Sequence, residues 1–471
     1  MRFPRATGIL LHPTSLPGPN GIGEIGPEAF GFADWLAEAG QRIWQVLPLG
    51  PTGYGDSPYQ CFSAFAGNPL LLSLDRLVDR GYLSQQDIAR RPQFPQAHVD
   101  YGAVMQWKLP ILAKAAKAFF RHSCERDDFD RYCDRNAHWL DDFALFMARK
   151  QPEIGEGVQR YWQFEFDRQW SALHEHCRRR GIRIMGDLPI YVAGDSSDVA
   201  SHPDLFRTDV VAGVPPDYFS ATGQLWGNPI YRWDKLQETG YEWWIDRFRA
   251  VLAQVDMVRM DHFRGFEAYW EIPAGARTAM HGQWVKGPGA ALFHAIEARL
   301  GKLPLIAENL GVITPEVEAI RDQFGYPGMS ILQFAFGSDP QGPSFRPHNY
   351  PRHQVAYTGT HDNDTTLGWW NSEAGGDSIR TTADIASERD FTKRYLRTDG
   401  TEMNWVFIQT IMASVADTVL VPIQDVLGLG TEARMNLPGR PDGNWRWRMR
   451  PGSPRADDAA RLRGLVQMYD R

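Results

Sequence analysis

Eight short apolar segments, each running into a polar or glycine-containing loop, recur along the chain. Their aliphatic and β-branched residues are typical of strands buried on both faces of a parallel sheet. Helix-like stretches lie between several of them. Eight such strands interleaved with helices predict an α/β fold, the (β/α)8 TIM barrel. The segments lie near Leu10, Val46, Ile184, Val258, Ile306, Leu332, Tyr357 and Leu420.

Helix signals fit the same repeat. Pro27 suits the first turn of a helix that ends at Gly40, and Thr314 with Pro315 marks the start of another. Residues 337–353 carry no helical pattern, which is the weakest point of the barrel prediction. Further helices are expected over residues 104–121, 136–150, 160–180, 289–301, 401–414 and 457–470.

Two long excursions interrupt the barrel repeat. Residues 50–180 separate the second and third strands, and residues 190–240 follow the third strand. The sequence has no obvious linker, so we expect one catalytic TIM-barrel domain over residues 1–471 in which both excursions are inserted subdomain regions. Because insertions at the carboxyl ends of barrel strands build the active-site walls, both should border the site.

Charge and composition narrow the class of partner. The formal net charge is -7 and no basic stripe stands out, which argues against nucleic acid and anionic membranes. The chain start lacks the apolar core of a signal peptide, and no apolar run is long enough to span a bilayer. Its 4 cysteines form no CxxC pair, which favours free thiols. We therefore expect a cytoplasmic protein, a monomer or weak oligomer, with a neutral substrate.

Carboxylates stand where four of the expected strands end. Asp187, Asp261 and Glu308 close the third, fourth and fifth strands, and His361 with Asp362 follows the seventh. On a barrel, all would lie on the catalytic face. Each acid alone could cap a helix, but four at one face favour a site. Two carboxylates with a third to assist are the equipment for breaking and remaking a glycosidic bond.

The roles of the acids differ with their neighbours. Arg259 and Asp261 are two residues apart on one strand and point to the same face, so the guanidinium should lower the pKa of Asp261 and suit it to be a nucleophile. Like-charge repulsion should raise the pKa of Glu308, as an acid/base requires. Asp362 would favour the oxocarbenium-like transition state. Its neighbour Asp364 competes for that role on chemical grounds alone.

Aromatic residues in loops rich in glycine and proline suggest contact with sugars. Such rings can pack against the apolar faces of pyranoses while polar neighbours take the hydroxyls. Tyr101 is a further candidate of this kind. The loop aromatics are Tyr54, Tyr59, Tyr218, Phe219 and Trp226.

Two other motifs are decoys. Residues 21–26 satisfy GxGxxG but do not directly follow a strand, and no acid stands about 20 residues on, so a dinucleotide site is not expected. His174, Glu175, His176 and Cys177 lack the HExxH spacing and lie in an expected helix. We expect no cofactor and no metal.

Eight motifs together resemble the amylomaltase-type 4-α-glucanotransferases, glycoside hydrolase family 77, which are related to the α-amylases. The resemblance runs over essentially the whole chain, although the segment before VAGVPP looks shorter than in the family. The motifs are GILLHPTSLPG, WQVLPLGPTGYGDSPYQ, GDLPIYV, VAGVPPDYFSATGQLWGNPIYRW, VRMDHFRG, AENLG, THDNDT and GTEARMNLPG.

This resemblance implies a retaining double displacement on an insertion-bearing TIM barrel. Asp261 would be the nucleophile, Glu308 the acid/base and Asp362 the transition-state stabiliser. The partners would be α-1,4-glucans, such as maltooligosaccharides and starch or glycogen fragments, with glucose as an acceptor. The candidate substrate-binding residues are Ser57, Tyr59, Asp187, Trp226, Arg259, His361 and Asn436, together with Tyr54 and Tyr101.

Two alternatives remain open. An α-amylase-like hydrolase would use the same acids and differ only in whether water or a sugar takes the intermediate. A non-catalytic glucan-binding protein would be expected to have lost at least one of the acids, whereas Asp261, Glu308 and Asp362 are all present.

Overall fold

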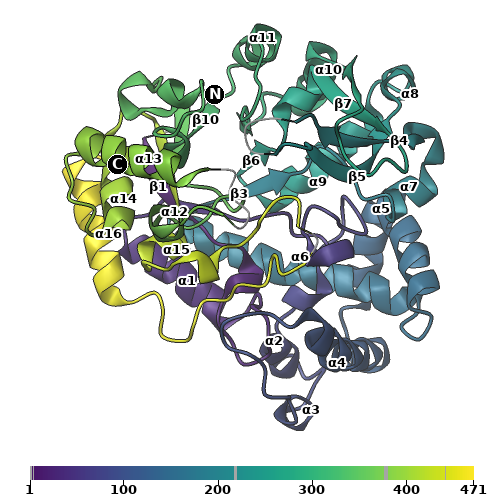
Figure 1. Ribbon diagram of the computed structural model, residues 1–471. Coiled ribbons are helices and arrows are strands. Elements are labelled where there is room, and N and C mark those ends of the chain that lie inside the picture. The colour runs from purple at the N-terminus through teal and green to yellow at the C-terminus, as the bar shows by residue number, and fades with distance from the viewer. Residues whose placement is uncertain (1–2, 4, 217–219, 376–379, 441) are drawn as a thin grey trace.

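The computed structural model describes residues 3, 5–216, 220–375, 380–440 and 442–471. Eight parallel strands form one sheet in the order β10-β11-β12-β1-β2-β3-β6-β9 (Figure 1). All eight expected strands are confirmed. They are β1 (Ala6–Leu10), β2 (Ile43–Gln45), β3 (Arg183–Leu188), β6 (Met257–Met260), β9 (Leu305–Ala307), β10 (Gly328–Ile331), β11 (Gln354–Tyr357) and β12 (Thr418–Pro422).

The two ends of this sheet meet. The N–H of Ala307, at the end of β9, donates to the carbonyl oxygen of Pro327, just before β10, over 2.9 Å. Each of these eight strands contributes to one buried cluster, which fills the barrel interior. The (β/α)8 fold is therefore confirmed. The cluster contains Phe3, Ala6, Ile43, Met185, Met257, Ile306, Met329, Ile331, Val355, Tyr357 and Leu420.

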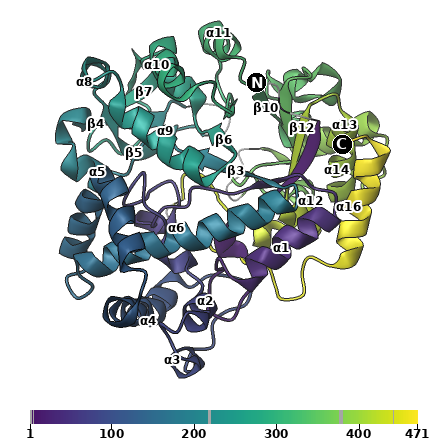
Figure 2. The ribbon, with the colours of Figure 1, turned by 180° about the vertical axis from the view of Figure 1, so that it is seen from behind.

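Helices surround the barrel where the sequence signals place them. Helix α6 packs against both α1 and α9 on the outside of the sheet (Figure 2), and α16 packs against α14. None of the described helices has the length and apolar character needed to cross a membrane. The barrel helices are α1 (Pro27–Glu38), α6 (Glu156–Arg179), α9 (Glu242–Gln254), α10 (Ala290–Leu300), α11 (Pro315–Phe324), α14 (Met403–Ala413) and α16 (Ala456–Met468).

Further helices follow the last two strands of the barrel. Helices α12 (Thr366–Asn371) and α13 (Thr382–Leu396) precede α14, and α15 (Ile423–Val426) follows β12. Residues 332–353, all of them described, form only 3-10 turns and no α-helix, as the absence of a helical pattern indicates.

The first excursion lies at one edge of the molecule (Figure 1). It consists of loops with α2 (Leu74–Asp79), α3 (Gln85–Ala89), α4 (Tyr101–His122) and α5 (Arg126–Lys150), and the chain then enters α6. Helix α6 packs both against α5 of this excursion and against β3 of the barrel. Lys108 on α4 forms a buried ion pair with Glu24 and also donates to the Leu70 carbonyl oxygen over 2.7 Å. The ion pair attaches the excursion to the segment between β1 and α1.

The second excursion builds a separate antiparallel sheet. After α7 (Ser197–Ser201), strands β4 (Phe206–Val214) and β5 (Gln224–Tyr231) form a hairpin, and α8 (Trp233–Glu238) returns to the barrel. Strands β7 (Ala268–Pro273) and β8 (Gln283–Lys286), which follow β6, complete the sheet in the order β5-β4-β7-β8. This third excursion is not anticipated from the sequence, because its pairing partner is remote in the chain.

Candidate active site

The carboxyl ends of three neighbouring strands carry three of the acids. Asp187 lies within β3, while Asp261 and Glu308 directly follow β6 and β9. The Asp261 N–H donates to the Leu188 carbonyl oxygen, and the Glu308 N–H to that of Met260, each over 3.1 Å. These bonds continue the sheet by one residue and place both acids at the rim of the barrel, as the strand-end argument predicts.

Arg259 holds two of these acids together. It stands level with Asp187 in the β3–β6 register, and its side chain is only 3% exposed. Its Nη1 donates to both oxygens of Asp187, over 2.9 and 2.7 Å, and to Asp261 Oδ1 over 3.1 Å. Burial disfavours the charge of Arg259, but the carboxylates outweigh it and raise its pKa well above the ordinary value. The guanidinium therefore stays charged.

Burial governs the titration of Asp261 and Glu308. It raises the pKa of Asp261, against the lowering effect of Arg259, so the expected net lowering is wrong in sign. Burial also raises the pKa of Glu308, and the negative charge of Asp261 adds to this, which confirms the expected direction. Because Arg259 bonds directly to Asp261, a single proton shared by the two acids belongs on Glu308.

The residue after Asp261 positions Glu308. His262 adopts the left-handed conformation, with φ 46 and ψ 50, and its N–H donates to Glu308 Oε2 over 2.7 Å. Its ring meets that of Trp226, on β5, edge to face at 4.7 Å between centroids. The second excursion therefore borders the site, as the sequence predicts.

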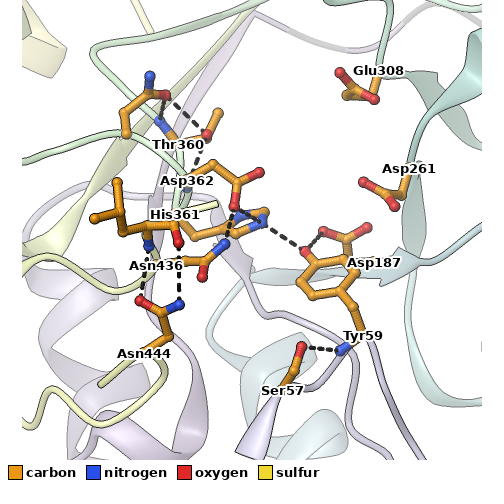
Figure 3. Close-up of polar contacts among 12 residues, drawn as sticks. Ser57, Tyr59, Asp187, Asp261, Glu308, Thr360, His361, Asp362, Asn436 and Asn444 are labelled. Carbon is orange, nitrogen blue, oxygen red and sulfur yellow. Dashed lines mark hydrogen bonds and ion pairs between the residues drawn. The ribbon is translucent and has the colours of Figure 1, made fainter. Parts of the chain in front are cut away.

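Tyr59 joins the acids to His361. Its hydroxyl lies 2.8 Å from Asp187 Oδ2 and 2.9 Å from His361 Nε2, and the two rings stack at 5.2 Å (Figure 3). Burial raises the pKa of Tyr59 well above its ordinary value, so the hydroxyl keeps its proton and donates it to Asp187. Its oxygen must then accept from His361, which assigns the proton of this neutral imidazole to Nε2.

Asp362 faces Asp261 and Glu308 from the opposite side (Figure 3). Its side chain is 42% exposed and accepts a hydrogen bond from Asn436 Nδ2 over 2.6 Å. Asp364 instead accepts from the Thr365 N–H and the Thr431 hydroxyl, each over 2.8 Å, at the start of α12. The geometry therefore distinguishes two acids that the sequence left as competitors.

The remaining candidates differ in their contacts and exposure. Ser57 accepts from the Tyr59 N–H over 3.2 Å and shapes the turn below it (Figure 3). Tyr54 is 77% exposed on the same loop. Tyr101 is only 4% exposed, and its hydroxyl donates to the Trp445 carbonyl oxygen over 3.0 Å. Direct contact of Tyr101 with a ligand is thus not supported. Tyr218 and Phe219 lie outside the described residues.

Two residues of the site escaped sequence reasoning. Arg434 Nη2 donates to the Asp362 carbonyl oxygen over 2.7 Å, and its Nε donates to that of Asn436. The Trp445 ring lies 5.6 Å from Tyr59 and 5.8 Å from His361. The motif around Asn436 could have indicated Arg434. Trp445 begins the alternating segment WRWRMR, and this pattern does not indicate contact with the site.

The metal-like tetrad forms no joint site. His174 pairs with Asp256 at 2.9 Å and His176 with Asp34 at 2.8 Å, so the two rings serve different carboxylates. Within the part of the chain that the structure describes, no group of three or more His, Cys, Asp or Glu side chains could hold a metal ion.

A TIM barrel with two acids at the carboxyl ends of neighbouring strands has the equipment of enzymes that act on glycosidic bonds. The family model described as 4-alpha-glucanotransferase, glycoside hydrolase family 77, matches residues 11–160 and 149–454. This chain belongs to that family.

Individual relatives cover the whole chain. It is 50% identical to the 4-alpha-glucanotransferase of Thermus thermophilus, over 100% of both chains. It is 45% identical to that of Synechocystis sp., over 99% of this chain and 98% of the relative. Among solved structures, the amylomaltase from Streptococcus agalactiae in complex with acarbose superposes with a TM-score of 0.92 at 37% identity, covering 99% of each chain.

Proposed function

We propose that this protein is a 4-α-glucanotransferase. It transfers a segment of an α-1,4-glucan to the 4-hydroxyl of an acceptor glucan or glucose by a retaining double displacement. The observation that carries this proposal is the pairing of Asp261, bonded to Arg259, with Glu308, bonded to the His262 N–H, in a chain of this family.

In the first displacement, the ionised carboxylate of Asp261 attacks the anomeric carbon of the donor glucan. Glu308 gives its proton to the glycosidic oxygen, and the leaving chain departs with a free 4-hydroxyl. An ester between Asp261 and the donor sugar results. The raised pKa of Glu308 supports this role, since the group keeps its proton above the usual range of a carboxyl.

In the second displacement, the 4-hydroxyl of an acceptor glucan attacks the same anomeric carbon. Glu308, now ionised, takes the proton of that hydroxyl, and the bond to Asp261 breaks. Two inversions restore the α configuration. Asp362, oriented by Asn436, binds sugar hydroxyls and favours the oxocarbenium-like transition state at both steps.

The remaining side chains form the substrate walls in this proposal. Trp226 and Tyr59 offer rings to the apolar sugar faces, and Asp187 and His361 hold the Tyr59 hydroxyl in place. Exposed Tyr54 extends the surface outward, while Ser57 and buried Tyr101 act by holding the loops that carry Tyr59 and Trp445.

Incubation with maltotriose tests the proposal. Transfer releases glucose together with a ladder of longer oligosaccharides, and the total number of reducing ends stays constant. Hydrolysis adds one reducing end for each bond cleaved, so growth of reducing ends in step with glucose would identify a hydrolase. Asp261→Asn should lose turnover on the order of 10³-fold or more while glucan binding is largely kept.

We further propose a cytoplasmic enzyme of one domain over residues 1–471 that acts as a monomer or weak oligomer. All 4 cysteines are free thiols, which supports a reducing compartment. Light scattering after size-exclusion chromatography would measure the mass, and cell fractionation the location.

A further inference from the structure

A small cavity lies behind the ring of His361. The ends of β1 and β12, the loop after β11 and the segment around Met435 line it. Its volume is about 30 Å³. Because an ordered water needs roughly 10 to 15 Å³, the cavity has room for one or two. The lining includes His12 and His361 but none of Asp261, Glu308 and Asp362.

Both histidines that line this cavity carry an unpartnered nitrogen. His12 is 6% exposed and His361 5%, and the Nδ1 atom of each is buried without a hydrogen-bond partner in the described part of the chain. Leaving a buried polar atom unsatisfied costs roughly 1 to 3 kcal/mol. Two such atoms at one cavity of this size indicate a built water site.

The position of the proton on His361 decides whether its Nδ1 must accept or donate a hydrogen bond. Its Nε2 carries the proton, since Tyr59 donates to Asp187 and accepts from the imidazole. Nδ1 of His361 is then a lone pair that needs a donor. Burial, and after it the proximity of His361, lowers the pKa of His12 to about 3, and burial lowers that of His361, so both rings are neutral at pH 7.

His12 is held firmly enough to serve as an anchor. It stands two residues after β1 and precedes the 3-10 turn Pro13–Ser15, whose Ser15 hydroxyl donates to the Trp447 carbonyl oxygen over 2.8 Å. This turn belongs to the motif GILLHPTSLPG, in which no residue has a role in the chemistry proposed above.

We propose that a water molecule in this cavity bridges Nδ1 of His12 and Nδ1 of His361, so that His12 is a positioning residue for the transfer reaction. The water donates a hydrogen bond to His361 and holds its ring with Nε2–H directed at Tyr59 and towards Asp362, whose Oδ1 lies 3.4 Å away. The kinetic consequence rests on the proposed glucanotransferase activity, whereas the imidazole state does not.

Matched variants of His12 test the kinetic part. His12→Leu removes the polar atom at similar size, while His12→Asn keeps a polar atom where Nδ1 lies. His12→Leu should lower kcat for maltotriose about tenfold or more, as the loss of one orienting hydrogen bond allows, with KM within about twofold. His12→Asn should stay within about threefold of the wild type. His176→Leu, on the far helix α6, should leave both constants unchanged.

Equal loss in the Leu and Asn variants, or no loss in either, would overturn the positioning role. A wild type without any transfer activity would instead count against the proposed function. If His12→Leu does not fold, nitrogen-15 NMR of histidine-labelled protein decides the matter. Wild-type His361 should show a protonated Nε2 and an unprotonated, hydrogen-bonded Nδ1, and His12→Asn should keep this pattern. A protonated Nδ1 in the wild type would refute the proposal.

Discussion

The backbone N–H of His262 donates to Glu308 Oε2 over 2.7 Å, and it does so from the left-handed region at φ 46. A residue other than glycine or asparagine pays conformational energy there, about 1 to 2 kcal/mol. The fold thus stores strain in the residue next to Asp261 in order to orient Glu308. Strain of this kind is typical of functional sites.

Substitution of His262 by Gly and by Val separates the backbone from the ring. Both variants lose the contact of the ring with Trp226, but Gly accepts the left-handed conformation and Val resists it. We expect the free energy of unfolding of the Val variant to be about 1 to 2 kcal/mol lower than that of the Gly variant. The Val variant should also turn over maltotriose about tenfold more slowly. Urea unfolding and initial rates measure this. Equal behaviour of the two would contradict a role for the backbone bond.

Asp362 and Asp364 offer a matched pair. Asp362→Asn removes charge from the acid that faces Asp261 and Glu308, so turnover should fall at least about 10²-fold with little change in stability. Asp364→Asn weakens the bonds to Thr365 and Thr431, so it should cost about 1 kcal/mol of unfolding free energy and keep turnover within a few fold. The opposite pattern would exchange the roles of the two acids.

Glu308→Gln should lower turnover and raise the stability of the fold at higher pH. The pKa of Glu308 is raised in the folded state by burial, so its contribution to stability is fully present below the unfolded pKa and is lost as pH rises through the folded pKa. Gln never ionises. The variant should therefore match the wild type in acid and exceed it on the order of 1 kcal/mol at higher pH, while turnover falls about 10²- to 10⁴-fold. Thermal unfolding across the pH range checks the sign, and a stability gain confined to acid would contradict it.

Tyr101→Phe tests whether this residue binds ligand. The hydroxyl of Tyr101 donates to the Trp445 carbonyl oxygen, so its removal should cost about 1 to 2 kcal/mol of unfolding free energy. Because the ring is buried, glucan affinity measured by calorimetry should change less than about twofold. Weakened binding at unchanged stability would restore the direct contact expected from the sequence.

Local sequence patterns predicted most of the fold and the positions of the acidic residues. Apolar runs such as those before Asp261 and Glu308 are typical of strands that are buried on both faces. An acidic residue at the carboxyl end of such a strand lies on the catalytic face of the barrel. The spacing of Arg259 and Asp261 likewise implied their contact, which the structure shows at 3.1 Å. These features depend on a few neighbouring residues, and a sequence can be read for them directly.

Only the tertiary structure decided what depends on distant partners. The pairing of β4 with β7, the different partners of Asp362 and Asp364, the burial of Tyr101 and the position of Trp445 follow from contacts between remote segments. The same holds for the pKa of Asp261: the sequence reveals the neighbouring charge of Arg259, but the extent of desolvation, which outweighs that charge, is set by everything packed around the site.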